Sequence, residues 1–182
     1  MRSSLLRRVG GFREELPHTA DFEMWMRLAL HSDVGYVWGP HQAWYRDHPM
    51  GMHHQQFGTT LADLTQIWTA FQLLFRDHAQ MIPHCQHLEE NVKRRLAQRA
   101  LLAACRAYDW GIVDPAEVAG LEELAVTIYG NAHTLSVMRG LRWRKRMGSG
   151  PCRMLAPCLV LTNTQHFWRK FRGWRLHRLG LL

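Results

Sequence analysis

The sequence predicts a small mixed α/β segment followed by a mainly α-helical region. Short apolar runs bounded by turn residues, at 34–38 and 42–46, follow a helical pattern that begins near residue 20. From residue 60 to about 146, apolar residues recur at the three- and four-residue spacing of helices. We therefore expect three parts, which are an α/β segment at 1–55, a helical region at 56–147 and a basic, aromatic-rich tail at 148–182.

The first predicted helix follows two breaks in the chain, the glycines Gly10-Gly11 and then Pro17. Thr19 is a suitable cap for a helix starting at Ala20, and it puts Asp21 in the first turn, where a carboxylate interacts favourably with the helix dipole. The apolar face predicted for this helix consists of Phe22, Trp25, Met26 and Ala29.

Two strands are predicted next. Residues 34–38 form a short apolar run, and Gly39-Pro40 turns the chain. Residues 42–46 then alternate, with Ala43 and Tyr45 on one side.

Four helices are predicted after the strands, at 60–78, 87–108, 115–130 and 131–146. The third has the clearest start, because Asp114 can cap it, Pro115 suits its first position and Glu117 completes a capping box. Residues 148–151, Gly-Ser-Gly-Pro, indicate a linker.

Charge is distributed unevenly along the chain. Residues 1–123 hold 12 Lys and Arg against 15 Asp and Glu, whereas residues 124–182 hold 11 Lys and Arg and no carboxylate. This asymmetry suggests that the C-terminal part contacts something anionic. Only three of the cations are lysines, so most can pair with phosphate through a guanidinium group, although a GC-rich genome would also favour arginine.

The four cysteines, Cys85, Cys105, Cys152 and Cys158, have neither a C-x-x-C spacing nor a disulfide framework, and we expect reduced, intracellular thiols. The N-terminus lacks a secretory pattern. The longest apolar run near the end, 154–161, is far shorter than the ~20 residues that span a membrane.

The residues around Asp21 carry the main functional signal. A carboxylate at a helix start, beside a turn, can take a proton from an acceptor hydroxyl. The alternative is an Asp that only stabilises the first helical turn. Five pieces in register surround it, and they read Val9-Gly10-Gly11-Phe12, Leu16-Pro17, Trp25-Met26-Arg27-Leu28-Ala29, Val34-Gly35-Tyr36-Val37 and Tyr45-Arg46-Asp47-His48-Pro49, with Asp21 itself between the second and third.

Over residues 2–52 this order resembles the acceptor-side half of family-2 glycosyltransferases of the GT-A fold. The resemblance implies an inverting transfer in which Asp21 is the general base. It implies substrate-binding roles for His18, Trp25, Arg27, Arg46 and His48. For Trp25 and Arg27 the ordinary alternatives are core packing and a salt bridge, and His48 could equally be a surface histidine.

The same resemblance implies a nucleotide-sugar donor, a glycan or lipid-linked acceptor, and a divalent metal, Mg or Mn, at an Asp-x-Asp site. Ala20 stands where many relatives have Glu, and residues 1–182 contain no assigned Asp-x-Asp site or donor-binding half. We therefore expect a partial transferase that is inactive by itself, and that is cytoplasmic or peripheral at the inner face of the membrane.

A second function class is a non-catalytic basic protein. Residues 167–178 interleave Phe and Trp with Arg and Lys, which suits an anionic membrane surface, whereas nucleic acid is a less natural partner and a solvated terminus is the ordinary alternative. The sequence His84-Cys85-x-His87 has no second ligand pair, which favours a loop before a helix over a zinc site.

Overall fold

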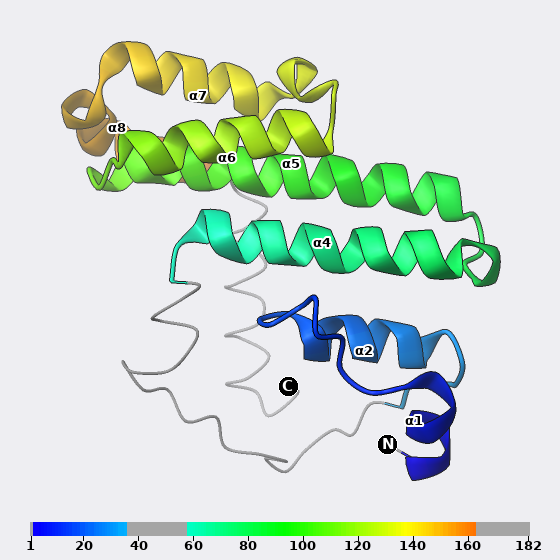
Figure 1. Cartoon of the computed structure of the whole chain (residues 1–182). Helices are drawn as coiled ribbons and strands as arrows, with labels where there is room; N and C mark the ends of the chain where they lie inside the picture. Colours follow the sequence, from blue (N-terminus) through cyan, green and yellow to red (C-terminus); the bar gives the residue numbers. More distant parts are fainter. Residues whose placement is uncertain (1, 36–57, 163–182) are drawn as a thin grey trace, which may run out of the picture.

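The computed structural model describes the backbone of residues 2–35 and 58–162, with side chains up to residue 156. Every regular element in these ranges is helical (Figure 1). The α-helices are α1 (Ser3–Val9), α2 (Ala20–Ala29), α4 (Thr60–His78), α5 (Cys85–Trp110), α6 (Pro115–Ile128), α7 (Ser136–Met147) and α8 (Ser149–Thr162), and the short 3-10 helices are η1 (Ala79–Met81) and η2 (Ala132–Thr134).

The prediction of an α/β segment at 1–55, as a remnant of a GT-A domain, is wrong for the described residues, which form helices and no strand. Val34 was expected to open a strand, but it is 78% exposed and belongs to no regular element. A short apolar run is stable as a strand only when other strands pair with it, and no segment in the described ranges provides one. The rest of the first predicted strand and all of the second lie outside the described residues.

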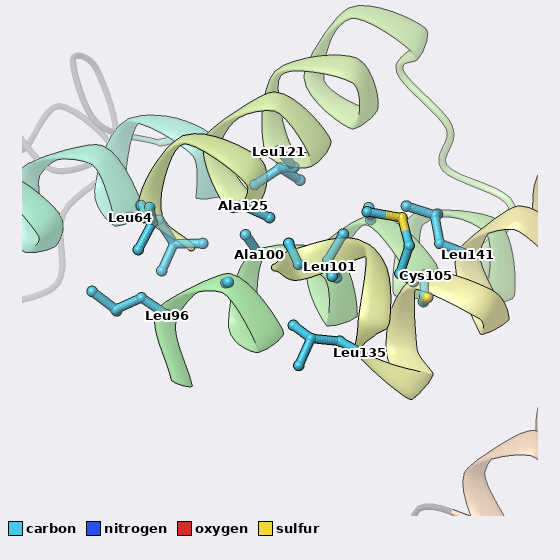
Figure 2. Packing of buried hydrophobic residues seen from close by; sticks show 14 of the residues in the cluster. Leu64, Leu96, Ala100, Leu101, Cys105, Leu121, Ala125, Leu135 and Leu141 are labelled. Atoms are coloured by element: carbon cyan, nitrogen blue, oxygen red, sulfur yellow. The ribbon is translucent and has the colours of Figure 1, made fainter. Parts of the chain in front are cut away.

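Helix α5 is the centre of the helical bundle, which we define as α4 to α8. It packs against α4, α6, α7 and α8, and α7 is the outermost layer at the top of Figure 1. The main core lies where these helices meet, and Figure 2 shows its apolar side chains pointing toward one another. Its fully buried members include Leu64, Ala100, Leu101, Ala125 and Leu141.

Capping explains where α4 and α6 begin. Thr59 accepts a hydrogen bond from the Ala62 amide at 3.2 Å, and Asp114 accepts one from the Ala116 amide at 2.9 Å, as the sequence predicted for Asp114. Glu117, expected to complete the capping box of α6, instead accepts a hydrogen bond from the Thr60 amide at 2.9 Å. Glu117 therefore satisfies a free backbone amide in the first turn of α4, and it links α6 to α4.

The linker predicted at 148–151 is wrong, because α7 ends at Met147 and α8 begins at Ser149. Gly148 alone separates them, with a φ of +78° that favours glycine. Cys152 in α8 is fully buried, so the first turns of α8 belong to the bundle.

Residues 2–35, the N-terminal segment, lie against the other side of α4, with α2 beside α4 and α1 beside α2 (Figure 1). Two small apolar clusters hold this segment in place. Leu16 packs with Ala70 and Leu73, and Met26 and Leu30 pack against Leu74, Phe75 and Ile82. Across the described residues, no helix has the length and apolar character needed to cross a membrane.

Candidate functional site

Asp21 lies in the first turn of α2 and its side chain is exposed to solvent. Its Oδ1 accepts a hydrogen bond from the amide of Phe22 at 2.7 Å. The carboxylate therefore does not point into packed protein. It stays accessible to a molecule that approaches the start of the helix, as a general base must be.

Arg27, one of the predicted substrate-binding residues, is 5% exposed and takes part in a structural ion pair. Its Nε donates to Oε1 of Glu23 at 2.9 Å, and its Nη2 donates to Oε2 at 3.1 Å. Its alternative role, a salt bridge, is the one that the structure supports. The i, i+4 spacing of Glu23 and Arg27 is a sequence signal for this pair.

The remaining donors of Arg27 bind the diglycine turn. Its Nη1 donates to the carbonyl oxygens of Val9 and Gly10, the latter at 3.2 Å, and its Nη2 donates to that of Gly11 at 2.6 Å. Gly10 has a φ of +93°, a conformation that favours glycine, and a Cβ there would lie 3.3 Å from the Arg27 Nη1. Two pieces of the motif that are separate in sequence are thus joined by one guanidinium group.

Glu23 is fully buried and also accepts a hydrogen bond from Arg13 Nε at 3.0 Å. The Nη2 of Arg13 reaches Asp77 of α4 at 2.8 Å. Hydrogen bonds from Arg76 and then from Arg13 lower the pKa of Asp77 from 3.8 to about 2, against the opposing effect of burial. Neither Glu23 nor Arg13 stood out in the sequence as a member of the site. Their arrangement fixes α2 relative to α4.

His18 and Thr19 connect the residues just before α2 to α4. The His18 Nε2 lies 3.3 Å from Asp63 Oδ1, and the Thr19 hydroxyl donates to the carbonyl oxygen of Gln66 at 3.1 Å. Thr19 was predicted to cap α2, but its side chain makes no capping hydrogen bond. Both residues hold the segment before Asp21 in place.

Trp25 is 64% exposed, so the packing alternative for this residue is wrong. The most buried residues of α2 are Glu23, Met24, Arg27 and Leu28. Of the predicted apolar face, Met26 packs against a core cluster and Phe22 contacts the Phe71 ring, whereas Trp25 and Ala29 are exposed. Trp25 lines a hollow of about 990 Å³ between α1, α2 and residues 31–35. It lies one turn after Asp21 on the same side of the helix, because residues four apart are neighbours on a helix surface.

Two predicted substrate-binding residues, Arg46 and His48, lie outside the described residues, so the structure does not place them relative to Asp21. Among the residues that it does describe, no group of three or more His, Cys, Asp or Glu side chains could hold a metal ion.

The described site therefore consists of an open carboxylate, an exposed indole one turn away, and a buried Arg13–Glu23–Arg27 cluster that fixes their helix. In such a site, the carboxylate can accept a proton from a hydroxyl group, and the indole can offer an apolar face to the molecule that carries this hydroxyl. No protein-family model matches this chain, and neither does any curated protein or solved structure.

Proposed function

We propose that the chain supplies the acceptor side of an inverting sugar transferase, in which Asp21 takes the proton from an acceptor hydroxyl. One observation carries this proposal: Arg27 binds the diglycine turn and so joins it to the helix whose first turn exposes Asp21. Within the described residues, two of the five matched pieces, the diglycine turn and the piece in α2, are therefore connected in space. A set of unrelated matches would not need to be connected in this way.

In this proposal, Asp21 receives the proton while the acceptor oxygen attacks the anomeric carbon of the donor and the nucleoside diphosphate leaves. A general base contributes about a hundredfold to ten-thousandfold to such a rate. Trp25 offers its exposed indole face to the sugar ring of the acceptor. Arg27 positions the helix and does not contact the substrate, because its hydrogen-bond donors are used by Glu23 and the diglycine turn.

The donor is proposed to be a nucleotide sugar and the acceptor a glycan or a lipid-linked saccharide, with Arg46 and His48 as further substrate-binding residues. Because the described residues contain no group suited to a divalent cation, we assign no step to a metal. A cytoplasmic or inner-membrane location follows from the proposed donor. Residues 167–178 lie outside the described ranges, so contact between them and an anionic membrane remains a prediction.

The test is a transfer assay on the protein purified from its own cells together with its bound partners, by an antibody raised against residues 58–156. Labelled nucleotide sugars are supplied with an extract of the cell envelope as acceptor. We expect this preparation to release nucleoside diphosphate and to label the acceptor, and we expect no transfer by residues 1–182 produced alone in another host. A preparation that transfers no sugar from any donor in the panel would overturn the proposal.

A further inference from the structure

Helix α7 divides its five cations into two groups. Arg144 and Lys145 are paired, with Asp109 at 2.7 Å and with Glu122 respectively. Arg139, Arg142 and Arg146 are exposed, and within the described part of the chain none of the three has an ion-pair partner. No acidic residue follows Glu123 in the sequence, so α7 and the residues after it contain no Asp or Glu side chain.

These three exposed arginines share one side of α7 with two apolar residues. Positions 139, 142, 143, 146 and 147 follow the i, i+3, i+4, i+7, i+8 spacing of a single helix face. Trp143 is 39% exposed and Met147 is 41% exposed, whereas Met138 and Leu141 on the other side are buried in the core. We call these five residues, Arg139, Arg142, Trp143, Arg146 and Met147, the basic face of α7.

Among the described residues, the position of α7 leaves this face uncovered. Figure 1 shows α7 as the outermost helix of the bundle, on the side away from α4 and the N-terminal segment. Its buried side chains belong to the main core, and α7 packs against α5, α8 and η2. The basic face therefore points outward along about two helical turns, and a flat partner could contact all of it at once.

We propose that the basic face of α7 is a docking surface for an anionic phospholipid bilayer, on which the helix lies parallel to the membrane plane. Charge complementarity identifies the partner as anionic, because three exposed guanidinium groups have no ion-pair partner among the described residues. Trp143 and Met147 favour a bilayer over a nucleic acid. An indole ring is stable at headgroup depth, and a thioether side chain gains from the acyl boundary but not from a phosphate backbone.

This surface is distinct from the site at Asp21 and does not depend on sugar transfer. It also differs from the predicted tail contact at 167–178, because it is built from residues of the folded bundle. Its test therefore keeps the tail unchanged in every protein compared.

The experiment is flotation of the full chain with phosphatidylcholine vesicles that contain or lack phosphatidylglycerol. The test variant is R139Q/R142Q/R146Q, and the matched control is R94Q/R95Q/R106Q, which removes three exposed arginines of α5. Both lose the same net charge, so only the position of the charge differs. Circular dichroism and thermal unfolding check that each variant keeps its helices.

We expect the wild-type chain and the α5 control to float with anionic vesicles and not with neutral ones. The α7 variant should lose roughly a hundredfold in partition coefficient, since each basic residue near such a surface contributes about a fivefold effect. If the triple variant does not fold, R142Q should lose about fivefold and R142K should retain binding. W143A should bind more weakly than W143F.

Equal partitioning of the α5 and α7 variants would overturn the proposal, because charge would then act without regard to position. The proposal would also be overturned if the chain bound single-stranded RNA through the three α7 arginines and did not float with anionic vesicles. That result would assign the basic face to nucleic acid.

Discussion

Arg27 Nη2 lies 2.6 Å from the carbonyl oxygen of Gly11, 16 residues earlier in the chain. This contact joins the turn before α2 to the middle of α2, and the same guanidinium group pairs with the fully buried Glu23. The start of the helix, where Asp21 is exposed, is therefore fixed by a buried ion pair one turn further along.

Substituting Arg27 by Met should destabilise the chain by about 3 kcal/mol, because the buried Glu23 would lose one of its two ion-pair partners. The measurement is the free energy of unfolding in urea. Arg7→Gln is the matched control, since Arg7 is exposed in α1 and its loss should change stability by less than about 0.5 kcal/mol. Equal stability of the Met variant and the wild type would show that the cluster does not hold α2.

The diglycine turn permits a sharper comparison. Gly10→Ala should cost about 2 kcal/mol, because Gly10 has a φ of +93° and the new Cβ would lie 3.3 Å from Arg27 Nη1. Gly11→Ala should be close to neutral, since its Cβ would meet no atom within 4 Å. Thermal unfolding of both variants tests this, and a reversed order would contradict the geometry of the turn.

Local chemistry explains which helices could be predicted. Residue 60 begins α4 and Pro115 begins α6 as expected, because Thr59 and Asp114 carry their own capping groups. Helix α8 was missed because glycine and proline at 148–151 suggested a linker. Proline is also favoured in the first turn of a helix, where its missing N–H removes no helical hydrogen bond.

The site was only partly predictable for a different reason. The placement of Asp21 in the first turn of α2 is confirmed, since it depends on local sequence. The buried side of α2 was predicted only in part, because Met26 packs as expected, whereas Trp25 is exposed and tertiary contacts bury Glu23 and Arg27. A charged pair becomes a core element only through partners such as Arg13 and the turn carbonyls, and these are distant in sequence.

The ion pair between Arg144 of α7 and Asp109 of α5 should be important for stability. Its two contacts are 2.7 and 3.0 Å long, and Asp109 is 9% exposed. Arg144→Leu should cost about 3 kcal/mol by leaving that carboxylate unpaired. The control Lys145→Gln removes the more exposed pair with Glu122 and should cost less than about 1 kcal/mol. Chemical denaturation would refute this account if the two losses were equal.

Cys105 should resist alkylation in the folded protein. Burial, the largest cause, raises the pKa of its thiol from 9.0 to about 11, so almost no thiolate exists near neutral pH. Peptide mass spectrometry after iodoacetamide treatment should find Cys85, which is only half-buried, modified before Cys105. Cys105 should react only when denaturant unfolds the chain. Equal modification of both thiols in the native protein would contradict the buried position of Cys105.

The same shift predicts a pH dependence with a defined sign. Because the folded-state pKa of Cys105 lies above its unfolded value, its contribution to stability is complete below pH 9.0 and is lost as the pH rises toward about 11. The free energy of unfolding should therefore fall across this window, with a smaller slope in Cys105→Ala. Identical slopes for the two proteins would count against the assignment.

The most direct test of the central claim compares two acids in the transfer assay on the protein purified from its own cells with its bound partners. Asp21→Asn should lower the rate of sugar transfer at least a hundredfold and change stability by less than about 1 kcal/mol. Glu15→Gln, at an exposed acid outside the site, should leave the rate unchanged. An Asp21→Asn protein that transfers sugar at the wild-type rate would contradict a role for this carboxylate as the base.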